Sequence, residues 1–427
     1  MPRFLHVADV HLGFDRYENA ERTKDFFLAF QDALEKYAVR EAVDFVVIAG
    51  DLFEHRHILP ATLNQAQVCL DMLKEAGIPV LAIEGNHDNQ PYGTKSSWLR
   101  YLADWEKLIL LEPNEAATDG TELYDLWTPE MKTGGYIDLD CKGSQVRVLG
   151  SRWYGAAASQ TIVQLAAAIE LLPEGPQHTV MIFHHGLEGQ IARYEGALRY
   201  QDLLPLKDAG VDYLALGHIH KHYTAEGWIF NPGSVEANSI AESQGQNPRG
   251  VYLVEIDERG INAQLKQDYY QRSILRLNLE VNKQQTLIDL EEAAREKVRA
   301  VAQQGKTKQA IVELRISGQL GFNRLDLNVR SLRQQLHREC EALIFLLKYD
   351  ATGTEYETPL LAGDRAPTKS ELELQVFEDL LAANVYYSQK APELAKALID
   401  MKDRVLNNQP VENIYEFVQQ LLIEKSS

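Results

Sequence analysis

The sequence predicts an α/β fold: a layered β-sheet core flanked by helices, followed by a small α+β domain and a helical C-terminal segment. Three observations carry this prediction. Short apolar runs rich in β-branched and aromatic residues recur in the first half of the chain, segments with helical apolar spacing lie between them, and polar side chains able to bind metals follow the runs. Side chains that follow strand ends predict a site at the carboxyl edge of the sheet.

The first region, residues 1–272, contains the predicted core. Its expected strands are residues 4–8, 45–49, 80–83, 180–183 and 213–216. Helical spacing covers residues 23–41 and 62–76. A single large domain is therefore expected here.

Residues 273–350 predict a second, smaller domain. Strand patterns at 275–281, 310–317 and 343–349 alternate with helical patterns at 287–303 and 327–340, which gives a β-α-β-α-β order. Residues 351–370 contain Gly, Thr and Pro without an apolar period and predict a linker. Helical spacing over 371–383, 392–406 and 411–423 predicts a helical module at 371–427.

Composition indicates a globular protein. With 427 residues, 45% of them apolar, the chain can bury a large core. The N-terminus reaches Asp9 and His11 before an apolar signal region forms, and no run approaches the roughly 18 residues of a membrane span. We therefore expect a cytoplasmic protein without a membrane segment. Three separated cysteines without a C-x-x-C pair predict reduced thiols.

The net charge of −19 counts against a simple nucleic-acid binder, because affinity for phosphates comes mainly from Lys and Arg. The charge is unevenly distributed. Residues 281–350 hold twelve basic and nine acidic side chains, whereas residues 371–427 hold five and ten. Any surface that binds a polyanion should therefore involve the middle segment.

Five motifs carry the side chains of a predicted metal site. Each alone is weak evidence, because an isolated histidine at a strand end is more often a structural residue. All five in order, each after an apolar strand, indicate one shared site. The motifs are D-V-H at 9–11, G-D at 50–51, G-N-H-D at 85–88, H-H-G at 184–186 and G-H-I-H at 217–220.

The residue types fit a pair of divalent cations. Two cations about 3.5–4 Å apart need a carboxylate between them, and Asp51 is the candidate bridge. Asp9 and His11 are two residues apart and can bind one ion. His218 and His220 have the same spacing but can serve different ions where the chain leaves its strand, and the amide oxygen of Asn86 is a neutral ligand.

His87 follows Asn86 and is predicted to be a catalytic residue, not a ligand. Over a scissile phosphate it could donate a proton to the leaving oxygen or stabilise the pentacoordinate phosphorus. The alternative is a structural role in orienting Asn86.

The five motifs resemble those of the metallophosphoesterase superfamily, and finer detail resembles the SbcD-type DNA exonuclease subunit. The finer detail comprises H-V-A-D-V-H-L-G at 6–13, G-D-L-F at 50–53, and N-P-G-S at 231–234 followed by Glu236 and Ser239. The similarity covers residues 1–260 strongly and the remainder only in layout. It implies a β-sandwich flanked by helices.

The resemblance implies two divalent ions, expected to be Mn²⁺. One would be bound by Asp9, His11, Asp51 and His220, and the other by Asp51, Asn86, His184 and His218. His184 is preferred to His185 because the family's ligand lies two residues before the glycine. Some relatives carry a histidine directly after G-D-L-F, where this chain has Glu54 and then His55, so a second histidine that contacts phosphate is in question.

The resemblance also implies partners. The domain at 273–350 would cap the core and contact DNA through Arg330, Arg333 and Arg338, which fall near one face of a predicted helix. The module at 371–427 would bind the coiled-coil base of an SMC-like ATPase, and the chain would form a homodimer. A solvated basic face and helices that only complete the fold are the respective alternatives.

The leading functional prediction is a Mn²⁺-dependent DNA exonuclease and endonuclease that acts in repair or recombination. A phosphodiesterase or phosphatase for small molecules or phosphoproteins could use the same metals, and the acidic charge favours it slightly. The roughly 150 residues after the core favour the nuclease. An inactive scaffold would require missing ligands, and every ligand position is filled.

Overall fold

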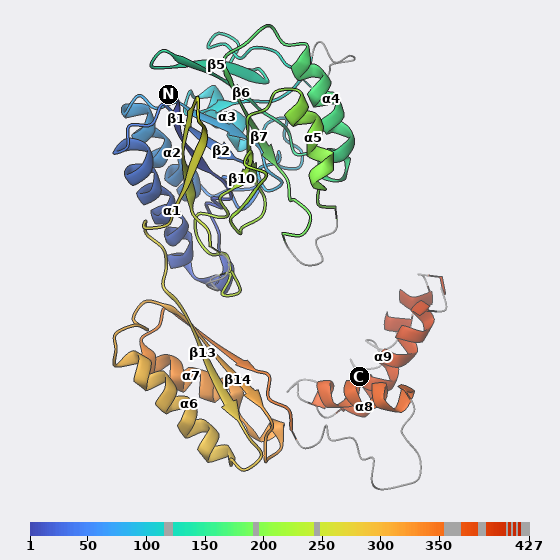
Figure 1. Cartoon of the computed structure of the whole chain (residues 1–427). Coiled ribbons are helices and arrows are strands. Elements are labelled where there is room, and N and C mark those ends of the chain that lie inside the picture. The colour runs from blue at the N-terminus through green and yellow to red at the C-terminus, as the bar shows by residue number, and fades with distance from the viewer. Residues whose placement is uncertain are drawn as a thin grey trace. The chain divides into compact units, whose positions relative to one another are not determined.

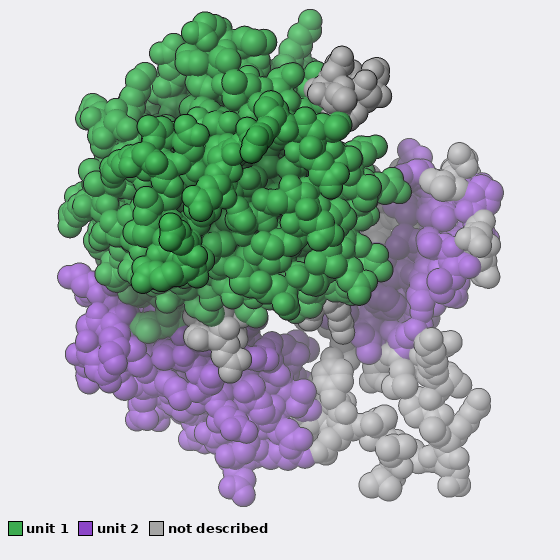
Figure 2. Space-filling model, turned by 45° about the horizontal axis from the view of Figure 1, so that its top comes forward, with its two compact units in different colours: residues 1–275, 309–311 green, residues 276–308, 312–427 purple. Residues whose placement is uncertain are grey.

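Two stacked β-sheets within the described residues position the candidate site. The computed structural model describes residues 1–114, 123–190, 196–242, 248–353, 369–382 and 390–406, with short pieces at 409–410, 413–415 and 417–419. The chain divides into two compact units, residues 1–275 with 309–311 and residues 276–308 with 312–427 (Figure 2).

The first sheet of the first unit has six strands among the described residues. Its central strands β1, β2 and β3 are parallel neighbours, so their carboxyl ends lie at one edge. The order across the sheet is β12 (Gly260–Lys266), β11 (Val251–Asp257), β1 (Arg3–Val7), β2 (Phe45–Ala49), β3 (Val80–Ile83) and β4 (Ile109–Leu110).

The second sheet also has six strands in the part of the chain that is described. Strands β6, β7 and β8 run parallel, and antiparallel strands complete both edges. Its order is β5 (Tyr136–Cys141), β6 (Ser144–Leu149), β7 (His178–His184), β8 (Tyr213–Gly217), β10 (Ile229–Asn231) and β9 (Tyr223–Ala225).

A buried apolar layer joins the inner faces of the two sheets. Phe4 and Phe45 from the first sheet pack with Ile182 and Tyr213 from the second, and the Phe4 and Tyr213 rings meet edge to face at 5.2 Å. Strand β2 contacts both β7 and β8 across this layer. The layer therefore brings the ends of strands from both sheets together.

Helices cover the outer faces of the two sheets (Figure 1). Helix α1 ends in a π-helical turn, η2, where the sequence predicts one helix over residues 23–41. The helices over the first sheet are α1 (Ala20–Leu34) with η2 (Glu35–Val39), α2 (Pro60–Glu75) and α3 (Trp98–Asp104); those over the second are α4 (Ala158–Glu170) and α5 (Tyr200–Asp208). The predicted α/β fold class, with helices flanking layered sheets, is confirmed.

The second unit begins with a three-stranded sheet of order β13-β14-β15 within its described residues. Capping side chains start both of its helices: Thr286 begins α6 and Asn328 begins α7. The elements are β13 (Ile274–Val281), α6 (Leu287–Ala302), β14 (Ile311–Gly318), α7 (Val329–Cys340) and β15 (Ile344–Tyr349).

Two further helices, α8 (Lys369–Ala382) and α9 (Ala391–Leu406), contact each other. Lys402 on α9 pairs with Glu373 on α8 at 2.5 Å. Most of the linker expected at 351–370, and most of the helix expected at 411–423, lie outside the described residues. None of the helices described is both long and apolar enough to cross a membrane.

Candidate metal centre

All five sequence motifs meet at the carboxyl ends of the parallel strands. Asp9 and His11 follow β1, Asp51 follows β2, and Asn86 and His87 follow β3. His184 is the last residue of β7, while His218 and His220 follow β8. Asp9, His11, Asp51 and His184 are all almost completely buried. The structure therefore brings the residues expected to bind metals into one place.

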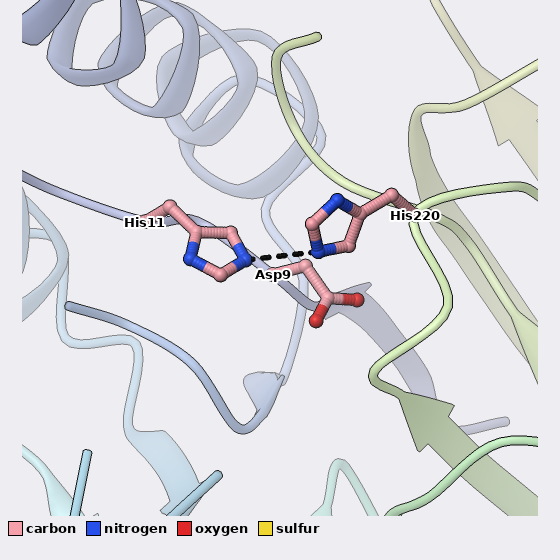
Figure 3. Close-up of side chains that lie close together, drawn as sticks. All are labelled: Asp9, His11 and His220. Atoms are coloured by element: carbon pink, nitrogen blue, oxygen red, sulfur yellow. Dashed lines mark hydrogen bonds between the residues drawn. The ribbon is translucent and has the colours of Figure 1, made fainter. Parts of the chain in front are cut away.

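The first group consists of Asp9, His11 and His220, whose potential ligand atoms all lie within 4.8 Å of one another. The Nε2 atoms of the two imidazoles face each other at 3.1 Å, with the Asp9 carboxylate beside them (Figure 3). Asp9 also accepts hydrogen bonds from the main-chain N–H of His218, at 2.9 and 3.0 Å. This contact ties the end of β1 to the end of β8.

The second group consists of Asp51, His184 and His218. The amide oxygen of Asn86 joins them, because it lies 2.9 Å from Nδ1 of His218 and 3.1 Å from Nε2 of His184. Oδ2 of Asp51 lies 3.3 Å from His184 Nε2 and 3.9 Å from His11 Nε2. Asp51 therefore stands between the two groups, in the position of a bridge.

The distances between these atoms fit ligands that share a cation. Two ligands that are each about 2.1 Å from one ion, at right angles, are about 3.0 Å apart. Contacts of 2.9 to 3.3 Å around Asn86 and Asp51, and 3.1 Å between His11 and His220, match this spacing. The mixed oxygen and nitrogen donors suit a first-row divalent metal.

The outer nitrogens of three imidazoles support the same conclusion. Nδ1 of His184 contacts the Ala49 carbonyl at 2.7 Å, and Nδ1 of His11 and His220 lie 2.7 and 3.4 Å from the carboxylates of Glu54 and Glu242. Carbonyl and carboxylate oxygens only accept, so each Nδ1 carries the proton. If both rings are neutral, each Nε2 is then a bare lone pair, and a proton or a metal ion shared by His11 and His220 would relieve the repulsion between the two lone pairs.

Electrostatics in the centre also favour bound positive charge. Burial by itself would raise the pKa of Asp51, but the imidazoles of His184, His11 and His87 lower the pKa well below its usual range. Burial by itself would lower the pKa of His184. The Asp51 carboxylate raises this pKa by more than burial lowers it, so the net pKa is about 9. The Asp51 carboxylate therefore favours positive charge at His184, whereas burial and the neighbouring His184 lower the pKa of His218 to about 3.

The backbone is strained at the candidate ligands. Asp9, His11, Asp51 and His218 have φ of 52°, 52°, 54° and 88°, a left-handed conformation that costs a non-glycine residue about 1–3 kcal/mol. Hydrogen bonds from the N–H groups of Val10 and His11 to the Asp51 carbonyl, at 2.9 and 3.0 Å, hold the first two motifs together. Such strain at a buried polar cluster is typical of a functional site.

Asp88 holds two motifs together, a role that the sequence did not indicate. Its buried carboxylate accepts hydrogen bonds from the N–H groups of Leu52, Phe53 and Gly85 at 3.0 to 3.1 Å. Burial and the nearby Asp51 charge raise the pKa of Asp88 to about 7. A Cβ at Gly85 would collide with Asp51, so this turn requires glycine. Asp88 therefore fixes the loop that carries Asn86 and His87.

Asn231 holds the turn that carries His220. Its side-chain amide donates to the carbonyls of Ile219 and Lys221, at 2.7 and 2.8 Å. The N–H of Ser234 adds a bond to the His220 carbonyl at 3.3 Å. The N-P-G-S motif, which marked the family resemblance, thus has a structural explanation.

His185 and Trp153 border the second group. The two nitrogens of His185 contact the carbonyls of Gly186 and Gly155 at 3.2 and 3.1 Å, so its ring is directed at main chain. The Trp153 ring stacks on His185, with centroids 5.5 Å apart, and lies 5.0 Å from the His218 ring. Trp153 lies outside the motifs, and no sequence signal identifies it.

His87 lies at the partly exposed side of the centre. Its N–H donates to Asp51 Oδ1 at 2.9 Å, and its ring Nδ1 contacts the Glu54 carbonyl at 2.6 Å. The rings of His87 and His11 meet edge to face, with centroids 5.0 Å apart. Its main-chain contact is with Asp51, the candidate bridge.

Arg330, Arg333 and Arg338 belong to the second unit. All three are exposed on α7, whereas Leu332 and Leu336 on the same helix are buried. They lie on the solvent-exposed side of this helix. The structure thus places them outside the metal centre, on a different compact unit.

Comparisons with known proteins agree with the geometry. The family model described as calcineurin-like phosphoesterase matches residues 2–222, just over half of the chain. The DNA double-strand break repair protein Mre11 of Archaeoglobus fulgidus is 31% identical over 245 residues, which cover 56% of this chain and 52% of that protein. The protein of the same name from Aeropyrum pernix is 30% identical over 224 residues, 52% of this chain and 49% of the relative. The chain spans about half the length of these curated relatives.

We predict that His184→Ala and His185→Ala have different effects on metal content. After loading with Mn²⁺, His184→Ala should retain no more than one ion per chain, because it removes a nitrogen from the second group. His185→Ala should retain two, because its ring contacts carbonyls instead. Elemental analysis of both variants tests this assignment, and the reverse pattern would make His185 the ligand.

Proposed function

Because the chain belongs to the calcineurin-like phosphoesterase family, we propose that its buried centre binds two Mn²⁺ ions and hydrolyses phosphodiester bonds in DNA. The observation that carries this proposal is the position of Asp51 between two groups of ligands. Asp9, His11, Asp51 and His220 would hold one ion, and Asp51, Asn86, His184 and His218 the other. When bound, the metals would activate a water molecule and offset the charge of the phosphate.

The role proposed for His87 is to supply a proton to the leaving oxygen. The Glu54 carbonyl accepts from Nδ1 and fixes the ring, so that Nε2 is the nitrogen left to act on substrate, and it would donate its proton from the doubly protonated, imidazolium form of the ring. His87 is only partly buried, which is consistent with access to a phosphate. A role in holding Asp51 through its main-chain N–H is compatible with this chemistry, because it uses a different atom.

DNA is supported as substrate by the relatives and by the charge distribution. Mre11 of Archaeoglobus fulgidus is named as a protein of DNA double-strand break repair. The segment 281–350 is locally basic within a chain of net charge −19, and Arg330, Arg333 and Arg338 are exposed there. We infer that these arginines contact the phosphate backbone, and that binding weakens steeply as salt rises.

A helical protein partner is supported by the C-terminal helices. Val376 and Leu380 on α8 are 44% and 63% exposed, and Val405 and Leu406 on α9 are 53% and 66% exposed. Apolar side chains exposed on amphipathic helices are suited to the apolar seam of a coiled coil. We infer that this module binds an SMC-like coiled-coil ATPase.

A homodimer is the second assembly proposed. The apolar stripe of α2, which includes Ala66 and Leu70, is buried in the core of its own chain. Leu28 on α1 and Val68 on α2 are 38% and 39% exposed and remain available to a second copy. Doubling the contact surface would offset the weak attraction of an acidic chain for DNA.

A phosphodiesterase or phosphatase for small molecules or phosphoproteins is the second candidate function. The metal centre would be the same, and the acidic charge of the chain favours a substrate with few phosphates over a long polyanion. Efficient hydrolysis of cyclic nucleotides or phosphoproteins under Mn²⁺, with single-stranded and duplex DNA left intact, would favour this candidate.

We predict that Asp51→Ala abolishes Mn²⁺-dependent cleavage of DNA while the chain stays folded, because the change removes a bridge and no core contact. Cleavage of labelled duplex and single strands, with circular dichroism as a check of folding, measures this effect. The exposed Asp208 on α5 provides a matched control, and Asp208→Ala should cleave at the wild-type rate. Cleavage by Asp51→Ala at that rate would exclude the two-metal centre.

His87→Ala should retain both ions and slow turnover by about a hundred-fold or more, the usual size of a lost general acid. Metal content and the rate constant need to be measured on the same preparation. A variant that lost an ion would show that His87 binds or supports a metal, contrary to its proposed role.

Reversing the charge of Arg330, Arg333 and Arg338 together should weaken DNA cleavage at least ten-fold more than hydrolysis of a small chromogenic phosphodiester, because the small substrate lacks the phosphate backbone that these arginines would contact. The ratio of kcat/KM for the two substrates is the quantity to measure. An equal loss on both would indicate misfolding, and an unchanged ratio would remove these arginines from the DNA contact.

A further inference from the structure

Glu54, three residues after Asp51, lies behind one of the candidate ligands. Its carboxylate Oε2 is 2.7 Å from Nδ1 of His11, on the side of the ring opposite to His220. We propose that Glu54 is a positioning residue, which fixes the orientation and the tautomer of His11 so that Nε2 points at the metal. This inference rests on the proposed function, since it assumes that His11 is a ligand.

The contact determines which nitrogen of His11 can bind a metal. A carboxylate accepts and does not donate, so it keeps the proton on Nδ1 and leaves the lone pair on Nε2. The His11 ring is 1% exposed, and neither its Nδ1 nor Oε2 of Glu54 makes a hydrogen bond of ordinary geometry with a described residue, so their 2.7 Å approach is a close contact between two otherwise unpartnered buried atoms. Without Glu54, the ring could flip or adopt the other tautomer. A flip would move Nε2 away from the centre, and the other tautomer would place a proton on Nε2 and remove its lone pair.

The main chain delivers this carboxylate to a fixed place. The N–H of Glu54 donates to the Leu12 carbonyl at 3.0 Å, and the N–H of Leu12 donates to the Leu52 carbonyl at 2.9 Å. Leu12 also pairs with Phe53 in a parallel β-bridge. These bonds connect the segments that follow β1 and β2, so Glu54 and His11 are held in register with each other.

Glu54 contacts a second imidazole through a different atom. Its carbonyl oxygen lies 2.6 Å from Nδ1 of His87. One residue therefore supports His11 with its side chain and His87 with its main chain. A substitution of the side chain leaves this main-chain contact with His87 in place, although the carboxylate and a ring nitrogen of His87 also lie within 4.8 Å of each other.

Another carboxylate behind a histidine supports this interpretation. His220, the imidazole that faces His11, has Nδ1 at 3.4 Å from Glu242. Both histidines of the first group thus have an acidic side chain on their outer nitrogen. A free carboxylate at position 54 would repel a phosphate substrate. A carboxylate in contact with His11 would repel it less, because a cation bound to His11 would partly neutralise the negative charge. The side chain of Glu54 is 17% exposed, so most of it is withdrawn from solvent.

The test is the affinity of the metal-stripped full chain for Mn²⁺, measured by isothermal titration calorimetry. In Glu54→Ala two ions should still bind at saturation, but the dissociation constant of one should rise about 10–100-fold, the usual effect of losing a partner of a metal-binding histidine. Glu54→Gln should retain most of the affinity, because its amide oxygen still accepts from Nδ1. Glu75→Ala, at the exposed far end of α2, is the matched control and should bind as wild type.

Kinetics add a second readout. At limiting Mn²⁺, Glu54→Ala should hydrolyse a chromogenic phosphodiester more slowly than wild type, and added Mn²⁺ should restore much of the lost kcat, because excess metal compensates for a weaker site.

Wild-type affinity for both ions in Glu54→Ala would overturn the proposal, and loss of one ion at saturation would make Glu54 a ligand instead. A wild-type chain that bound no ion would contradict the proposed metal centre. The wild-type titration therefore distinguishes a failure of the proposed function from a failure of the role proposed for Glu54.

Discussion

The buried carboxylate of Asp51, set between two groups of imidazoles, determines how the side chains of the metal centre are arranged. A charge removed from water must be compensated nearby, and the imidazoles of His11 and His184 approach Asp51 from different sheets. The apolar layer between the sheets aligns the strand ends, and strained backbone at Asp9 and Asp51 is tolerated because many main-chain bonds hold it. The packing of the two sheets therefore also determines the geometry of the site.

The expected metal-binding residues lie close together because their motifs follow parallel strands. They could be predicted because the pattern of apolar residues shows where each strand ends. The strand predicted at 45–49 coincides with β2, and the small α+β domain has the expected element order. The antiparallel edge strands β9 and β12 were not anticipated. Strand β9 has only three residues, too few for an apolar period. Strand β12 alternates Ile261, Ala263 and Leu265 with polar side chains, so its strand period is present in the sequence although it is not among the expected strands.

The supporting residues of the site could not be predicted in the same way. Trp153 approaches His218 from a distant part of the chain, and the partners of Asp88 include N–H groups more than thirty residues away. Such contacts depend on which strands become neighbours in space, and a local pattern does not contain that information. Glu54 was noticed in the sequence only as a departure from the family, and its contact with His11 explains how an acid can occupy that position.

Anomalous diffraction from crystals grown with Mn²⁺ would locate the two cations proposed on either side of Asp51. Two anomalous peaks about 3.5–4 Å apart are expected, the first near His11 and His220 and the second near His184 and His218, with the Asp51 carboxylate touching both. A single peak, or two peaks without Asp51 between them, would contradict the account.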